Sequence, residues 1–205
     1  MSGPVFWDWS DNRRQRKLTT VRDCILWSYA MLSVSRRAMK DLKAGKPYPY
    51  PQGRLKAANI EMTRYQRGQR NITSLDRDDR LAQDAFKICA HCGVVAEAYH
   101  WDHLIPQMRL VGEHLPLNQV RSCIPCNTGR GAKDLMEWHR VNKTFPSLAV
   151  LRRYLKLCYA YAERHDFLDQ PLAEAMQQGL PFNPGEFPRR FPPVELLVWD
   201  YGHNA

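Results

Sequence analysis

The stretch Cys89–Lys133 decides the fold of this chain: CAHCGVVAEAYHWDHLIPQMRLVGEHLPLNQVRSCIPCNTGRGAK. It contains two Cys-x-x-Cys pairs, Cys89/Cys92 and Cys123/Cys126. Such a pair places two thiolates on one tight turn, and two pairs supply four soft ligands for a tetrahedral zinc ion. Because four sulfur ligands leave no open coordination position, the sequence predicts a structural zinc site.

The alternative interpretation of these cysteines is a pair of disulfides. Residues 1–10 are aromatic and acidic, without an apolar run after a basic start, so we expect no secretory signal. A reducing compartment, the cytoplasm, is therefore expected, and there paired Cys-x-x-Cys motifs favour metal binding over disulfides. The remaining two cysteines, Cys24 and Cys158, fall in helix-like stretches and are expected to be small buried residues.

Between the two pairs lie residues with a different chemistry. Asp102 offers a hard carboxylate ligand for a cation such as Mg²⁺, and a neutral imidazole like that of His103 can take a proton from water near neutral pH. Asn127 follows Cys126 directly, so the second cysteine pair would fix the position of its amide oxygen. A metal with only two protein ligands keeps open positions for water and phosphate oxygens, as phosphodiester cleavage requires.

The order Cys-x-x-Cys, Asp-His, Asn, Cys-x-x-Cys-Asn resembles the HNH endonucleases, also called the ββα-metal or His-Me finger group. Its ending is similar to the zinc-stapled branch that includes phage recombination endonuclease VII and HNH restriction enzymes. The resemblance covers about residues 86–140. It implies that His103 is the general base and that Asp102 and Asn127 bind one catalytic Mg²⁺ or Mn²⁺ ion.

The resemblance also implies roles for three more residues of this stretch. Asn118 matches the middle Asn, which braces the loop and the orientation of the catalytic His. Arg130 and Lys133 stand where the family often has a basic residue that faces phosphate. The third family letter is His in many members and is Asn127 here.

The expected fold class is α+β, a zinc-bound ββα core within mostly helical flanks. Neighbouring side chains of a regular strand point to opposite faces, so Asp102 and His103 can face one phosphate only if the strand ends or bulges there. Pro106 is typical of a strand that stops. We expect these core elements: a strand at 96–104, a short second strand near 117–122, and a helix from about 127 to 140.

Three further histidines lie in the same window. His91, inside the first cysteine pair, is expected to be exposed, and His114 to be a loop residue. His100 would share a strand face with Asp102 and contact it indirectly. An isolated Asp-His pair is usually a solvated surface pair. The position of Asp102 and His103 between the two Cys-x-x-Cys pairs favours a functional site.

The basic charge of the chain is concentrated before the zinc stretch. The formal net charge is +9, and residues 1–80 hold 17 Lys and Arg against 8 Asp and Glu, whereas the rest is balanced. Such a segment suggests a nucleic-acid contact surface, the alternative being a solvated basic face. The candidate DNA-binding residues here are Arg13, Arg14, Arg36 and Arg37.

Three regions are expected to form one continuous unit: a basic, mainly helical DNA-contact or dimerisation region at 1–85, the nuclease core at 86–140, and a helical extension with a Pro-rich tail at 141–205. Apolar spacing predicts a long helix from Leu18, ended by Gly45 and Pro47, that serves as a scaffold or as a groove reader. Other expected elements are an extended spacer at 46–52, helices at 55–65, 76–87 and 147–166, a short helix capped by Asp169, and a terminal strand or arm at 194–199.

Taken together, the sequence predicts a metal-dependent endonuclease that acts on double-stranded DNA. A site-specific enzyme of the restriction type is one form it can take, and a homodimer is a candidate assembly. Two alternatives stay open. One is a structure-selective or nicking HNH nuclease of the junction-resolvase kind, and the other is a non-catalytic zinc-dependent module that binds nucleic acid. No apolar run approaches the roughly 20 residues of a membrane span, so no membrane partner is expected.

Overall fold

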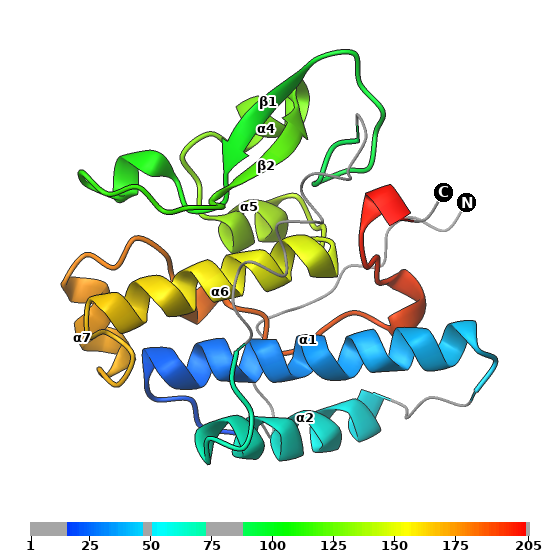
Figure 1. The fold of residues 1–205 in the computed structure, drawn as a ribbon, viewed down its shortest axis with the longest axis vertical. Helices are drawn as coiled ribbons and strands as arrows, with labels where there is room; N and C mark the ends of the chain where they lie inside the picture. Colours follow the sequence, from blue (N-terminus) through cyan, green and yellow to red (C-terminus); the bar gives the residue numbers. More distant parts are fainter. Residues whose placement is uncertain (1–15, 47–50, 73–87, 204–205) are drawn as a thin grey trace.

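A computed structural model describes residues 16–46, 51–72 and 88–203, and all structural statements below concern these residues. The helices stack in layers, with α2 (Pro51–Gln66) on one side of α1 (Val21–Lys43) and α6 (Leu148–Arg164) on the other. A small antiparallel hairpin and two short helices lie on the far side of α6 (Figure 1). The chain is thus an α+β protein with a two-stranded sheet at one end.

Helix α1 is the scaffold of the molecule. Thr20 caps its first turn by accepting a hydrogen bond from the Asp23 backbone N–H, and the helix ends before Gly45, whose φ of 66° suits glycine. Thirteen of its 23 residues are buried, because α2 and α6 cover two of its faces. The predicted helix is confirmed, and its packing between α2 and α6 agrees with the predicted scaffold role.

Helix α2 confirms the expected helix at 55–65 and begins earlier, at Pro51. The expected extended spacer therefore ends sooner than predicted, since Pro51 and Gln52 are helical. Proline is well tolerated in the first turn of a helix because it has no N–H to satisfy there. The expected helix at 76–87 lies wholly outside the described residues.

Helix α6 begins at the predicted cap, where Ser147 accepts from the Val150 backbone N–H. The next helix, α7 (Leu172–Gln177), is not capped by Asp169 as expected: its N-cap is Pro171, and Asp169 instead pairs with Arg22 of α1. This ion pair gives the carboxylate a charged partner that a cap would not offer.

The chain after α7 is irregular and forms short 3-10 turns at Pro184–Glu186, Val194–Leu196 and Tyr201–His203. The predicted strand at 194–199 is not formed, so the arm is the correct alternative. This arm is fixed on α6, since the backbone N–H groups of Leu148 and Ala149 donate to the carbonyls of Val198 and Trp199, each at 2.8 Å.

The hairpin pairs β1 (Tyr99–His103) with β2 (Gln119–Cys123), which confirms both predicted strands in shorter form. Helix α4 (Ile124–Arg130) follows at once, then α5 (Leu135–Val141). The expected single helix from about 127 to 140 was wrong. Gly131 adopts a φ of 54° and ends α4, and Asp134 then caps α5 by accepting from the Met136 N–H.

One hydrophobic core joins the three regions expected from the sequence. It contains Val21 of α1, Leu104 and Leu135 from the hairpin end, and Leu155 and Phe191 from the last third of the chain. The hairpin and its short helices are therefore packed onto the same core as the long helices. Within the described part of the chain, no helix is both long and apolar enough to cross a membrane.

Candidate functional site

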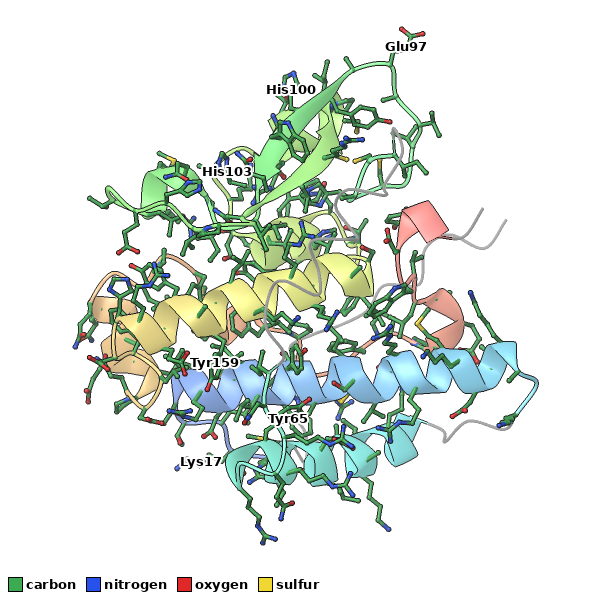
Figure 2. The ribbon with its side chains drawn as sticks, viewed as in Figure 1. Lys17, Tyr65, Glu97, His100, His103 and Tyr159 are labelled. Atoms are coloured by element: carbon green, nitrogen blue, oxygen red, sulfur yellow. The ribbon has the colours of Figure 1, made fainter. Side chains whose placement is uncertain are left out.

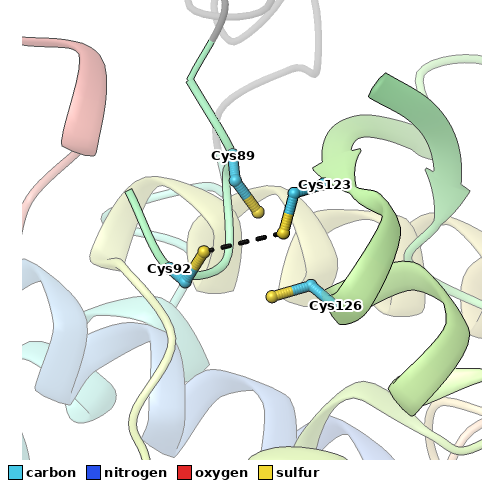
Figure 3. Close-up of side chains that lie close together, drawn as sticks. All are labelled: Cys89, Cys92, Cys123 and Cys126. Carbon is cyan, nitrogen blue, oxygen red and sulfur yellow. Dashed lines mark hydrogen bonds between the residues drawn. The ribbon is translucent and has the colours of Figure 1, made fainter. Parts of the chain in front are cut away.

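Four cysteine side chains converge (Figure 3). Two come from the turn at residues 89–93, called here the first cysteine turn, and two from the junction of β2 and α4. The sulfur atoms of Cys89, Cys92, Cys123 and Cys126 all lie within 4.8 Å of one another, and those of Cys92 and Cys123 are 3.8 Å apart. A tetrahedron with Zn–S bonds of about 2.3 Å has edges of about 3.8 Å. The four thiols therefore fit a zinc ion, and the predicted cluster is formed.

The thiols of the cluster differ in how readily they lose a proton. Burial works to raise the pKa of Cys89, but backbone N–H groups of Cys123, Cys92 and His91 outweigh it and lower the pKa to about 7. Burial and the neighbouring thiols raise the pKa of both Cys92 and Cys126. Since thiolates are the zinc ligands, zinc binding would release protons and would strengthen as the pH rises.

Gly93 shapes the first cysteine turn. Its φ of 76° is left-handed, and its N–H donates to the Cys89 carbonyl, which closes the turn. A Cβ atom at this position would overlap the ring of Tyr201. The C-terminal arm therefore packs directly over the cluster, and only glycine satisfies both constraints.

Asp102 lies on β1 beside the cluster and is only 4% exposed. Its Oδ2 accepts from Arg130 Nε at 2.7 Å and lies 2.8 Å from His91 Nε2, while its Oδ1 accepts from Arg130 Nη2. Burial opposes ionisation, but the hydrogen bonds from His91 and Arg130 outweigh it and hold the pKa of Asp102 below its usual value. Asp102 is thus a buried, fully ionised carboxylate.

Arg130 is directed inwards, which differs from the expectation that it faces phosphate. It is 1% exposed, and a guanidinium has five N–H donors, all of which find partners here. Besides the three contacts with Asp102 and the His103 carbonyl, Nη1 donates to the carbonyls of Leu104 and Lys133 at 3.4 and 3.1 Å. Arg130 therefore ties α4 to β1 and has no donor left for a substrate.

His103 is the last residue of β1 and is partly exposed. Its Nε2 lies 2.9 Å from the side-chain amide nitrogen of Gln119, its cross-strand partner. Figure 2 shows His103 at the end of the hairpin strand and His100 farther along it. Of the two alternatives, a strand that bulges or one that ends, the structure has the second: β1 ends at His103, as Pro106 suggested.

The end of the strand brings the predicted residues to one open depression. Asp102, His103, Asn127 and Arg130 all line it, although they come from β1 and α4. The rest of its lining is formed by Trp101, Pro106, Gln107, Met108, Gly131 and Ala132. The side chains of Asp102 and His103 point to opposite faces of β1. Both can border one depression because the strand ends at its rim.

Two side-chain oxygens at this depression, Asp102 Oδ1 and Asn127 Oδ1, have lone pairs that could bind a hard cation. A carboxylate has about four lone-pair sites, and the contacts with Arg130 and His91 use three of them, which leaves one on Asp102 Oδ1. Asn127 uses Nδ2 for a 3.1 Å contact with His100 Nδ1, so its Oδ1 is the atom that would bind a cation. Two oxygen ligands suit Mg²⁺ or Mn²⁺ and leave most positions open.

Asn118 braces the loop that follows β1. It is 2% exposed, its Oδ1 accepts from the Ile105 N–H at 2.9 Å, and its Nδ2 donates to the Ile105 carbonyl at 2.8 Å. The Asn118 carbonyl also accepts from the Leu104 N–H at 2.8 Å. It does not line the depression, so it acts on His103 only through the backbone.

The other basic residues predicted to bind DNA differ in exposure and in the groups that they contact. Lys133 is exposed and donates to the Gly129 carbonyl at 3.3 Å. Arg36 stacks over the Trp199 ring at 4.0 Å, and Arg37 lies 3.4 Å from Glu61, so both are engaged within the protein. Arg13 and Arg14 lie outside the described residues.

The remaining histidines of the stretch also differ from one another. His114 is exposed, as expected of a loop residue. His91 was expected to be exposed and is buried, because it packs edge-on against Trp138 and contacts Asp102. No local sequence signal indicates the burial of His91, since Trp138 lies far along the chain.

Gln119 was not predicted as a site residue, although pairing of the two strands would have placed it opposite His103.

Comparisons of this chain with protein-family models, with curated proteins and with solved structures found no match.

Proposed function

We propose that this chain is a divalent-metal-dependent endonuclease that hydrolyses phosphodiester bonds in double-stranded DNA. One observation carries the proposal: Asp102, His103 and Asn127, which combine two hard oxygen ligands with one imidazole, line a single open depression. This depression adjoins a four-cysteine cluster that fits structural zinc. The proposed hydrolytic side chains thus border one depression beside this cluster.

The residues of the depression have distinct roles in the proposed reaction. His103 takes a proton from the water that attacks phosphorus, as a general base. Asp102 Oδ1 and Asn127 Oδ1 would hold the divalent ion, which when bound supplies charge stabilisation for the phosphate and the leaving oxygen. Asn118 and Arg130 keep the backbone around His103 in place through the contacts given above.

Gln119 controls which nitrogen of His103 is available. With its amide nitrogen towards His103, Gln119 donates to the Nε2 lone pair at 2.9 Å. Rotation of the amide by half a turn brings its oxygen to the same place, where it accepts the Nε2 proton and leaves Nδ1 as the base. The second arrangement suits catalysis, because a hydrogen bond to one imidazole nitrogen fixes the tautomer that exposes the other.

The surface next to His103 suits a nucleic acid. Trp101 is 55% exposed on the same strand, and Arg121 opposite it lies over its ring at 5.5 Å. Trp101, Arg121, His103 and Gln119 share one face of the hairpin, since alternate residues of a strand point the same way. An aromatic ring and cations next to a phosphate-cleaving group are suited to contact with bases and backbone.

The test is cleavage of a supercoiled plasmid in Mg²⁺ or Mn²⁺ by the wild type and by His103→Ala. We expect the substitution to lower the rate by about 100-fold or more, the usual contribution of a general base. His114→Ala is the matched control, because His114 is an exposed histidine of the same module outside the depression. Equal rates for wild type and His103→Ala would remove His103 from the mechanism.

A second candidate is a non-catalytic zinc module that binds nucleic acid. The buried ion pair between Asp102 and Arg130 favours it, because a carboxylate with a purely structural role would show the same contacts. Binding of DNA by the wild type without cleavage in either metal would support this candidate over the nuclease.

The form of DNA that is cut depends on how many sites act together. One depression cleaves one strand, so a double-strand cut needs two copies of the chain or two successive nicks. Comparing linear duplex, four-way junction and single-stranded substrates would distinguish a restriction-type enzyme from a structure-selective one. Preference for the junction would support the latter.

A further inference from the structure

His91 connects the cysteine cluster to the depression. It is one residue from Cys92 and two from Cys89, and its side chain is completely buried. The ring packs edge-on against Trp138, with ring centroids 5.2 Å apart and planes at 74°. On its other side, Nε2 lies 2.8 Å from Asp102 Oδ2.

This placement of His91 has an energetic cost. Its Nδ1 is buried and has no hydrogen-bond partner among the described residues. A buried polar atom without a hydrogen-bond partner is destabilising, so the placement of His91 is best explained by the contact that its other ring nitrogen makes. That contact is with the one carboxylate that lines the depression.

Two groups approach the Asp102 carboxylate from different elements. Arg130 of α4 contacts both oxygens, and His91 of the first cysteine turn contacts Oδ2 alone. Oδ2 therefore has two partners and Oδ1 has one, which makes Oδ1 the oxygen with remaining capacity for a cation. Without His91, both oxygens would have equal capacity, and the carboxylate would lose one of the contacts that fix its rotation.

We propose that His91 is a positioning residue that couples the four-cysteine cluster to the divalent-ion site, by holding the Asp102 carboxylate in its ion-binding orientation. This inference rests on the proposed function, since it assigns a partner to the same site. Hydrogen-bond partners of a metal-ligating carboxylate commonly contribute 10- to 100-fold to metal affinity. Because His91 shares its turn with Cys89 and Cys92, loss of zinc would also loosen the contact with Asp102.

The main experiment measures Mn²⁺ binding to the full chain by the loss of the free-ion electron paramagnetic resonance signal. We expect His91→Ala to retain zinc and to bind Mn²⁺ about 10- to 100-fold more weakly than wild type. His91→Gln, whose amide can again donate to Asp102, should recover most of the affinity. His114→Ala, a substitution of the exposed histidine, should leave it unchanged.

Cleavage assays then separate this inference from the proposed function. In His91→Ala, the rate should recover when Mn²⁺ is raised to saturation, because His103 is intact. If the wild type cuts DNA and zinc-loaded His91→Ala binds Mn²⁺ as tightly as wild type, the coupling is wrong and the nuclease stands. If the His91 variants weaken Mn²⁺ binding but wild type cuts no DNA, the coupling stands and the nuclease is wrong.

A measurement on the wild type covers the case in which the His91 variants do not fold. In zinc-loaded protein labelled with ¹⁵N-histidine, saturating Mg²⁺ should shift the His91 Nε2 resonance, because its partner Asp102 becomes an ion ligand. His165, which pairs with Glu113 and does not line the depression, serves as the reference and should not shift. An unchanged His91 resonance at saturating Mg²⁺ would overturn the inference.

Discussion

Arg130 Nε and Nη2 donate to the two carboxylate oxygens of Asp102, and both side chains are buried. The two residues are separated by a full hairpin and the second cysteine pair, so this contact fixes α4 against β1. The same guanidinium also holds the His103 carbonyl, which places one cation behind two of the three proposed active residues.

The ion pair predicts a large loss of stability when Arg130 is replaced. We expect Arg130→Met to lower the free energy of unfolding by about 3–5 kcal/mol, since it leaves a buried carboxylate without its charged partner. Arg130→Lys should recover little, because an ammonium cannot reproduce the two-pronged contact with the carboxylate and the bonds to three carbonyls. Urea denaturation of the zinc-loaded protein measures both values.

The control for this prediction is Arg140→Met. Arg140 is about half exposed and pairs with Glu186 at 2.8 Å, so its loss should cost less than about 1 kcal/mol. Equal effects of the two substitutions would show that the buried pair contributes no more than a surface pair.

The cysteine cluster predicts one zinc ion per chain and a fold that depends on it. Cys126→Ser should lose the bound zinc and show a markedly lower melting temperature, because structural zinc contributes directly to folding. Cys24→Ser is the matched control, since Cys24 is a buried thiol of α1 whose pKa is raised to about 11 by burial and which lies outside the cluster. Elemental analysis and thermal unfolding check both, and full zinc content in Cys126→Ser would contradict the assignment.

His139 predicts a loss of stability in mildly acidic solution. It is fully buried, and burial first, then the charges of His91 and Arg130, lower its pKa well below 6.5. In the unfolded chain the imidazole gains a proton as the pH falls through about 6.5. In the folded protein the buried imidazole stays neutral until a lower pH. The stability is therefore present above pH 6.5 and falls by up to about 1.4 kcal/mol per pH unit below it.

His139→Asn should remove this slope while keeping the contact that Nδ1 makes with Thr144 Oγ1 at 2.8 Å. The free energy of unfolding, measured across the acidic range at constant zinc content, checks the prediction. If the variant and the wild type lose stability with the same slope, another group is responsible.

Asn118 predicts a structural effect that reaches His103. Asn118→Leu should lower the free energy of unfolding by about 2–5 kcal/mol, because the N–H and the carbonyl of Ile105 both lose a buried partner. Asn118→Asp keeps the acceptor for the Ile105 N–H but loses the donor to the Ile105 carbonyl. It should also lower the free energy of unfolding. Asn59→Leu is the control, since Asn59 is an exposed residue of α2 bonded to the Leu55 carbonyl and should change little. Denaturation curves with equal midpoints for the two leucine variants would contradict the bracing role.

Much of the local structure could be predicted because its causes are local. The spacing of the cysteines brings two thiols together in each turn, Thr20 and Ser147 cap the helices that follow them, and Gly45 ends α1. The two strands were expected at the places that the resemblance implies, and Pro106 indicated where the first one stops. The division of the expected helix at Gly131 was not, because a glycine within a helical pattern is compatible with either outcome.

The sequence by itself determined the two cysteine pairs and the long helices, since each depends on neighbours within a few residues. Only the tertiary structure decided that His91 and Arg130 point inwards and that α1 is a scaffold. Arginine is mostly exposed and histidine is intermediate, and a polar side chain is rarely buried unless hydrogen-bond partners receive it. The partner shared by His91 and Arg130 is Asp102, which reaches both side chains only after β1 has packed against α4 and the first cysteine turn.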